Sequence, residues 1–232
     1  MSNNYFSFKQ FTVWQSDCAL KVCTDACLFG AWVAAHIKED APSSILDIGT
    51  GTGLLSLLLA QKLPAAQIDA VEIDAAAAAQ AASNALATGW NIKVHNSAIE
   101  NFSGASYQHI ISNPPFFSND LKSDDVLRNT AMHSTTLTLA SLFTCVVKLL
   151  DKGGSFSVLI PYARATELEK LAAQFGLVII KKALVHQTPT HEPFRAMYIL
   201  SNTVTSPAVL EQIIIKENEQ YTASFATYLK DR

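Results

Sequence analysis

The chain from Ser44 to Gly53 reads Ser-Ile-Leu-Asp-Ile-Gly-Thr-Gly-Thr-Gly, and this stretch decides the fold. Its apolar first half predicts a buried strand, and residues 54–61 after the glycines predict the first turns of an apolar helix. Glycine accepts positive φ and lets a ligand approach the backbone, while a helix N-terminus presents free N–H groups. The stretch is therefore typical of a nucleotide-binding βα unit.

The next predicted strand, residues 67–74, ends in carboxylates about twenty residues beyond the glycines, where such units commonly hold a ribose diol. We choose Glu72 as the ribose-binding residue. A dinucleotide fingerprint would need its third glycine at position 54, where this chain has Leu54. A nicotinamide-dependent oxidoreductase is therefore disfavoured.

Strand-like and helix-like segments alternate along the rest of the chain, which predicts an α/β fold with a mostly parallel sheet. The last two predicted strands have only a loop between them, so we expect them to be antiparallel. We expect one domain over residues 1–232. The predicted helices are residues 75–88, 137–150 and 164–175, and the predicted strands are residues 92–95, 109–112, 155–160, 177–185 and 196–201.

The motif Asn113-Pro114-Pro115-Phe116 follows the fourth predicted strand and indicates a chemistry. An exocyclic amine on a base or an amide is a poor nucleophile, because its lone pair is delocalised. The Asn113 oxygen can accept one N–H of such an amine, and a carbonyl in the proline-stiffened loop can accept the other. Phe116 offers a ring for stacking a planar substrate. The competing interpretation is a strand that ends in a proline turn.

Composition is consistent with a cytoplasmic enzyme domain. The chain has 232 residues, of which 49% are hydrophobic, and no run of eighteen apolar residues or basic-then-apolar leader is visible. The four cysteines, at positions 18, 23, 27 and 145, lack zinc spacing, so we expect reduced thiols and no metal.

The net charge of −3 argues against a protein coated in positive charge, yet basic residues gather in three segments. For any single one of them, a solvated surface charge is the simpler interpretation. Together they are our candidates for nucleic-acid contacts: Lys9, Lys21, Lys122, Arg128, Lys181, Lys182 and Arg195.

The aspartate at the strand end, the glycine turn, the acid closing the second strand and Asn113-Pro114-Pro115-Phe116 resemble the class I S-adenosylmethionine-dependent methyltransferases of the amino-methylating type. The resemblance implies a Rossmann-like, seven-stranded sheet of order 3-2-1-4-5-7-6 with helices on both faces and an antiparallel last strand. It also implies S-adenosylmethionine as the cofactor, with its methionine end near Asp47 and Gly49, and Gly51 and Gly53 completing the turn.

Further segments resemble the valine tRNA adenine-N6 methyltransferases, and the match covers nearly the whole chain. They are residues 6–11, 21–32 and 128–133 and the pair Tyr221-Thr222. This resemblance implies N6-methylation of adenine 37, beside the anticodon, in valine tRNA. It also implies that an N-terminal segment, residues 1–35, covers the cofactor site, which makes Thr24 and Asp25 candidate cofactor contacts. The same pair fits a helix N-cap.

The chain departs from the family pattern at several points. Asn96-Ser97-Ala98 stands where an aspartate should contact the cofactor adenine, so we assign that contact to Asn96 or to backbone groups. Met132 replaces an expected basic residue, and Phe116 replaces a tyrosine.

Three alternatives stay open: a guanine-N2 rRNA methyltransferase, a protein glutamine methyltransferase, and an inactive cofactor-binding fold that serves as an RNA-binding module. The oligomeric state also stays open, with a monomer as our expectation.

Overall fold

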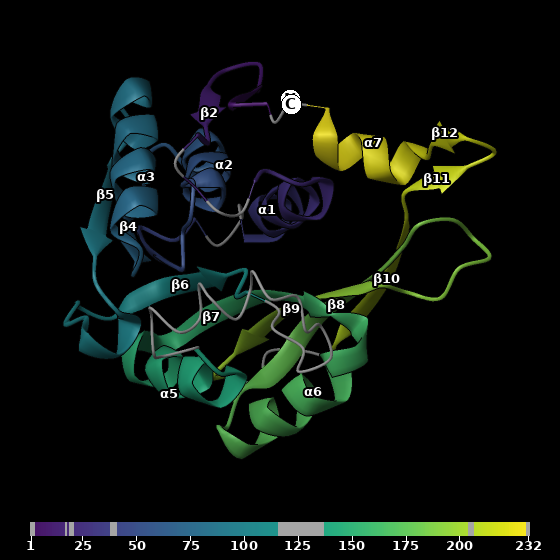
Figure 1. Ribbon diagram of the computed structural model, residues 1–232. Helices are drawn as coiled ribbons and strands as arrows, with labels where there is room; N and C mark the ends of the chain where they lie inside the picture. The colour runs from purple at the N-terminus through teal and green to yellow at the C-terminus, as the bar shows by residue number, and fades with distance from the viewer. Residues whose placement is uncertain are drawn as a thin grey trace, which may run out of the picture.

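The computed structural model describes residues 3–16, 18, 21–37, 41–115, 137–203 and 207–230. An eight-stranded sheet forms its centre (Figure 1). The strands are β3 (Ser44–Ile48), β4 (Gln67–Glu72), β5 (Ile92–Asn96), β6 (Tyr107–Ser112), β7 (Leu150–Pro161), β8 (Val178–His186), β9 (Arg195–Ser201) and β10 (Val209–Ile214). Their spatial order is β10-β8-β9-β7-β6-β3-β4-β5.

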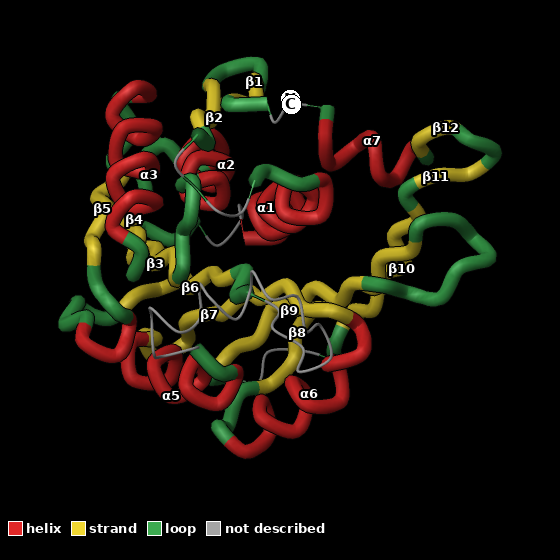
Figure 2. Tube along the Cα trace, viewed as in Figure 1, coloured by secondary structure: helices red, strands yellow, loops and turns green. Residues whose placement is uncertain are grey.

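The helices lie on both faces of this sheet, as Figure 2 shows. They are α1 (Thr24–Ile37), α2 (Leu54–Lys62), α3 (Ala75–Thr88), α5 (Leu139–Leu149), α6 (Ala165–Gln174) and α7 (Ala223–Leu229), with short 3-10 turns η1 (Ile99–Asn101) and η2 (Tyr162–Arg164). Two small hairpins complete the fold: β1 (Tyr5–Ser7) with β2 (Thr12–Trp14), and β11 (Lys216–Glu217) with β12 (Gln220–Tyr221).

The sheet confirms the predicted strand order and corrects the predicted strand number. Read from β5, the first seven strands follow the order 3-2-1-4-5-7-6, and β9 is antiparallel to both of its neighbours. The expected total of seven was wrong, because β10 adds an eighth strand parallel to β8. It is an edge strand with exposed Val209 and Leu210, so it lacks the apolar run that marks a buried strand. A second difference lies in β7, which begins at Leu150 and includes two glycines expected to precede the strand.

Alternation along the strands separates the core into two layers. In β3, Ile45 packs into the cluster formed with α1 and α2, whereas Leu46 and Ile48 pack into the cluster formed with α5 and α6. Successive side chains of a strand point to opposite faces, so one short strand contributes to both layers. Each fully buried leucine or isoleucine adds about 1.5–3 kcal/mol relative to exposure. The resulting rigid sheet positions the loops at its edge.

The N-terminal hairpin packs against α2 and α3. Phe8, Phe11 and Val13 form a small core with Leu54 and Leu57 of α2. The completely buried Asn84 of α3 accepts a hydrogen bond from Trp14 N at 3.0 Å and donates to Trp14 O at 2.8 Å and to Thr52 O at 2.9 Å. One side chain therefore connects β2 and α3 to the glycine turn.

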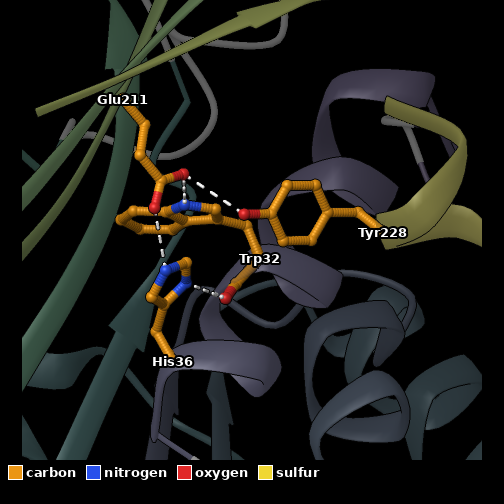
Figure 3. Close-up of polar contacts among 4 residues, drawn as sticks. All are labelled: Trp32, His36, Glu211 and Tyr228. Carbon is orange, nitrogen blue, oxygen red and sulfur yellow. Dashed lines mark hydrogen bonds and ion pairs between the residues drawn. The ribbon is translucent and has the colours of Figure 1, made fainter. Parts of the chain in front are cut away.

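The C-terminal helix is attached to α1 and β10 by a network centred on one carboxylate (Figure 3). Glu211 accepts hydrogen bonds from Trp32 Nε1 at 2.9 Å and from the Tyr228 hydroxyl at 3.2 Å, and its other oxygen lies 2.9 Å from His36 Nε2. Burial, followed by the Glu211 charge and hydrogen bond, raises the pKa of Tyr228 to about 12. The network holds three elements that are distant in the sequence.

Among the described helices, none combines the length and the apolar character that a membrane span requires.

Candidate functional site

Three neighbouring strands end at one edge of the sheet and bring the main candidates together. The register pairs Ile48 of β3 with Val71 of β4 and with Ser112 of β6. The next residues therefore lie along this edge in the order Glu72, Gly49, Asn113. The Ser112 hydroxyl donates to Ile48 O at 2.9 Å and fixes the end of β6 against β3. Ligands of open α/β sheets bind outside the carboxyl ends of the strands.

The glycine turn needs glycine at three positions, because φ is 72° at Gly49, 56° at Gly51 and 84° at Gly53. The N–H groups of Gly49 and Thr50 donate to Val71 O at 2.9 and 3.1 Å. A side chain built at Gly53 would meet Ala81 at 3.5 Å, whereas one built at Gly49 or Gly51 would meet nothing within 4 Å. Gly49 and Gly51 thus leave room for a ligand near the backbone.

Asp47 lies beneath this turn and is completely buried. Its Oδ2 accepts hydrogen bonds from Thr50 Oγ1 at 2.6 Å, Ser56 Oγ at 2.7 Å and Ser56 N at 3.2 Å. Burial raises its pKa to about 6, against the lowering effect of these hydrogen bonds, and the Glu72 charge adds to the rise. Asp47 connects the turn to the first turn of α2. Thr50 and Ser56, which the sequence analysis missed, hold it there; their only sequence signal is their place beside the glycines.

Glu72 points back to the glycine turn. Its Oε2 accepts from Gly51 N at 2.8 Å, and its Oε1 accepts from Asp74 N at 3.0 Å. Asn96 pairs with Glu72 in the register of β5 and β4 and donates through Nδ2 to the carbonyls of Glu72 and Ile73, at 3.0 Å each. Ile73, another residue the sequence analysis missed, is 49% exposed beside them. Two polar groups and one apolar side chain therefore meet at the end of β4.

Asn113 carries the most informative polar atom of the site. Its Oδ1 is buried and has no hydrogen-bond partner in the described part of the chain. A buried acceptor without a donor costs about 1–3 kcal/mol, which a folded protein seldom tolerates without a reason. Pro114 is buried and Pro115 is half-buried, so the loop is held where it leaves β6. Phe116 lies outside the described residues.

Thr24 and Asp25 begin α1 on the β9 side of the edge. Asp25 Oδ2 accepts from Arg195 Nε at 2.7 Å, an ion pair between residues 170 positions apart. The pKa of Asp25 lies below its ordinary value: burial acts to raise it, but hydrogen bonds from Cys23 and Arg195 outweigh burial. Burial, with help from Asp25, also raises the pKa of Cys23 to about 12. Two candidates from different predicted groups, Asp25 and Arg195, thus bind each other.

The remaining basic candidates that the structure describes have different contacts. Lys9 donates to the Lys230 carbonyl and Lys21 to the Gln15 carbonyl. Lys182, near the middle of β8, pairs with Glu169 at 2.7 Å, and Lys181 is its neighbour on the same strand. Lys122, Arg128 and Met132 lie outside the described residues. Over the ranges that the structure describes, no group of three or more His, Cys, Asp or Glu side chains could hold a metal ion.

Comparison with known proteins shows which family this chain resembles. The sequence model of the family called methyltransferase small domain matches residues 30–179. A tRNA1(Val) (adenine(37)-N6)-methyltransferase of Dyadobacter fermentans is 43% identical over 84% of this chain and 81% of its own. One of Pseudoalteromonas translucida is 39% identical over 92% of this chain and 91% of its own.

A solved structure, the magnesium protoporphyrin IX methyltransferase of Synechocystis with bound S-adenosylmethionine, shares the fold. The TM-score is 0.54 at 20% identity, over 78% of each chain. The identities to the two tRNA enzymes, sustained over most of each chain, establish the relationship at the level of sequence as well as fold. The chain belongs to the tRNA1(Val) (adenine(37)-N6)-methyltransferase family.

Proposed function

We propose that this protein methylates N6 of adenine 37 in valine tRNA, with S-adenosylmethionine as the methyl donor. Family membership supports the reaction and the substrate. The single structural observation that carries the chemistry is the buried Asn113 Oδ1 without a partner, at the strand end next to the glycine turn.

The residues at the edge fit the cofactor. The open side of Gly49 and Gly51 accepts a close approach, and the Glu72 carboxylate can accept hydrogen bonds from the two ribose hydroxyls. Asn96 and the exposed Ile73 are placed to contact a planar base. When bound there, S-adenosylmethionine supplies an electrophilic methyl group on a sulfonium.

Asn113 acts on the adenine amine. Its Oδ1 accepts one N6–H, and a backbone carbonyl of the proline loop accepts the other, so the N6 lone pair is withdrawn from the ring and becomes nucleophilic. Both acceptors gain strength as positive charge develops on N6, so they favour the transition state over the bound substrate. Phe116 stacks on the flipped base in this proposal.

Methylation of a defined transcript tests the proposal. The recombinant protein is incubated with S-adenosylmethionine and unmodified valine tRNA, and the nucleosides are located by digestion and mass spectrometry. We expect N6-methyladenosine at position 37, and none in a transcript with guanine at that position. A methylated guanine in ribosomal RNA, or a methylated glutamine in a release factor, with unmodified tRNA would replace this function with one of the alternatives.

The proposal places the protein in the cytoplasm with its tRNA substrate, acting as a monomer. Size-exclusion chromatography with light scattering, with and without tRNA, measures the oligomeric state directly.

A further inference from the structure

A pocket of about 240 Å³ lies beside the candidate site, and of its lining residues only Thr24 and Asp25 are candidate cofactor contacts. It is lined by Thr24, Asp25, Gln187, Phe194, Ile215, Lys216 and Tyr221. These residues come from the start of α1, the loop between β8 and β9, and the segment that follows β10.

The topology places this pocket at the same edge as Asn113. β6 and β7 are parallel, β9 is antiparallel to β7 and to β8, and β10 is parallel to β8. The ends of β6, β8 and β10 and the start of β9 therefore face the same side. Since neighbouring strands lie about 4.8 Å apart, β9 and β8 stand roughly 10–15 Å from β6 along the edge. The glycine turn lies on the opposite side of Asn113, so the pocket occupies the substrate side.

Two aromatic rings border the pocket. Tyr221 is 62% exposed. Its ring is nevertheless supported by Phe225, on which it stacks with the ring centroids 5.1 Å apart. The Lys216 ammonium lies 5.5 Å from the Tyr221 centroid. Phe194 contributes the second ring, with the Arg195 guanidinium 5.3 Å from its centroid. Phe194 is partly buried against the core, so Tyr221 is the exposed ring. An exposed aromatic ring beside a cationic group is the usual platform for stacking unpaired bases.

The polar groups of the pocket suit the edge of a base better than a phosphate. Gln187 offers an amide, Thr24 a hydroxyl and Asp25 a carboxylate. Hydrogen bonds of this kind read the edges of unpaired bases. Glu217 and Glu219, both exposed on the adjacent hairpin, offset the positive charge of Lys216 and so reduce the attraction for a phosphate. The volume is below the range of about 300–1,000 Å³ typical of larger ligands, which fits a single base.

The platform is preorganised. Lys216 N donates to Gln187 O at 3.0 Å, and Thr222 N donates to Ile215 O at 3.1 Å, so both ends of the hairpin are fixed. The Glu211 network of Figure 3 holds β10 before the hairpin and α7 after it. A ring that is already ordered loses little entropy when a base stacks on it.

We propose that this pocket binds an unpaired nucleobase flanking the target adenine in the anticodon loop, with Tyr221 as the stacking ring. The inference rests on the proposed tRNA function and adds a second point of recognition to it. The flanking base fixes the position of the loop, so that the neighbouring adenine is presented to Asn113.

The test measures RNA binding by fluorescence anisotropy with the valine anticodon stem-loop and a set of variants of it, each with one abasic nucleotide. The protein variants are Tyr221→Leu, which keeps apolar packing on Phe225 but loses the ring, and Tyr221→Phe, which keeps the ring. Leu210→Ala is the matched control, because it removes an exposed apolar side chain of β10 that does not line the pocket. Affinity for S-adenosylmethionine is measured by calorimetry in parallel.

We expect Tyr221→Leu to weaken stem-loop binding roughly 5- to 100-fold, the range of base–aromatic stacking, while Tyr221→Phe and Leu210→Ala bind as wild type. One abasic position beside the target should weaken binding to the wild-type protein by a similar factor and have no effect on Tyr221→Leu. Cofactor affinity should stay unchanged in every variant.

The inference is overturned if Tyr221→Leu binds the stem-loop with the affinity of the wild type. It is also overturned if each abasic nucleotide weakens binding to the wild type and to Tyr221→Leu by the same factor. If Tyr221→Leu unfolds the hairpin, Gln187→Ala decides, because it removes one amide from the pocket wall and should weaken binding of the same nucleotide. A wild-type protein that neither binds nor methylates tRNA rejects the proposed function as well. A methylating wild type with an indifferent Tyr221→Leu rejects the pocket alone.

Discussion

At the scale of single residues, the proposed function assigns cofactor binding to Glu72 and chemistry to Asn113. Glu72 lies within hydrogen-bond distance of the glycine turn, at 2.8 Å from Gly51 N. Asn113 presents its unpaired oxygen at the next strand but one. Substitutions at the two positions should therefore change different measured constants.

Glu72→Ala should weaken S-adenosylmethionine binding roughly 10- to 100-fold. The expected loss, about 1.5–3 kcal/mol, is that of hydrogen bonds to a charged carboxylate. Calorimetric titration of the cofactor measures it. Glu72→Gln serves as the control of similar shape. Its cofactor affinity should fall between those of the wild type and Glu72→Ala, because its amide keeps one acceptor for Gly51 N or for a hydroxyl. An unchanged dissociation constant in Glu72→Ala would remove Glu72 from the cofactor site.

Asn113→Ala should lower kcat about 10²–10³-fold, the usual cost of a lost hydrogen bond to charge that develops in the transition state. Its affinity for S-adenosylmethionine should match that of the wild type, which also reports that the variant is folded. Asn113→Asp keeps an acceptor oxygen at the same place and should retain more activity than the alanine variant. Single-turnover methylation of the tRNA transcript gives these rates. Normal turnover in Asn113→Ala would reject the mechanism.

At the scale of secondary-structure elements, the N-terminal hairpin and the glycine turn depend on one buried amide. Asn84 makes three hydrogen bonds, two to Trp14 of β2 and one to Thr52. These contacts link the segment predicted to cover the cofactor to the loop predicted to bind it. A change in the position of the hairpin should therefore alter the glycine turn.

Asn84→Ala should lower the free energy of unfolding by about 3 kcal/mol, because one buried and two partly buried backbone hydrogen bonds are lost at roughly 1 kcal/mol each. Urea denaturation measures this loss. Gln80→Ala is the matched control on the same helix, since it removes only an exposed hydrogen bond to Ser16 at 3.2 Å. Equal stability of the two variants would show that Asn84 does not anchor the hairpin.

At the scale of the whole molecule, two completely buried groups with opposite pKa shifts shape the pH dependence of stability. Burial lowers the pKa of His109 to about 3. Its contribution to stability is therefore complete above its ordinary value of 6.5 and is lost as the pH falls toward 3. Asp47, raised to about 6, contributes fully below 3.8 and loses that contribution as the pH rises through 6.

Between about pH 4 and 6 the two contributions change in opposite directions, each by about 1.4 kcal/mol per pH unit, and should cancel. On going from pH 6 to pH 4, the free energy of unfolding of His109→Gln should therefore rise by about 3 kcal/mol relative to that of the wild type. Asp47→Asn should lose a similar amount over the same interval, because the His109 contribution is then unopposed. Urea unfolding at several pH values gives both slopes, and slopes equal to that of the wild type in both variants would contradict the assignment.

Local sequence patterns determined much of this protein. The apolar strand, the three glycines and the following helix predicted the βα unit, since periodicity and glycine conformation are properties of neighbouring residues. The family resemblance predicted the strand order, and the strand pattern placed Asp47, Glu72 and Asn113 at or just after the ends of three predicted strands. These features needed no knowledge of distant contacts.

The tertiary structure alone decided the rest. The eighth strand, β10, forms because β8 offers an open edge, and its half-exposed residues carry no strong local signal. Asp25 pairs with Arg195 across 170 positions, a contact between two predicted site residues that no local pattern indicates. The burial of Asp47, the three bonds of Asn84 and the Tyr221 pocket likewise depend on segments that meet only in the folded chain. Sequence patterns report on nearest neighbours, whereas burial and pairing are set by whichever distant residues the fold brings together.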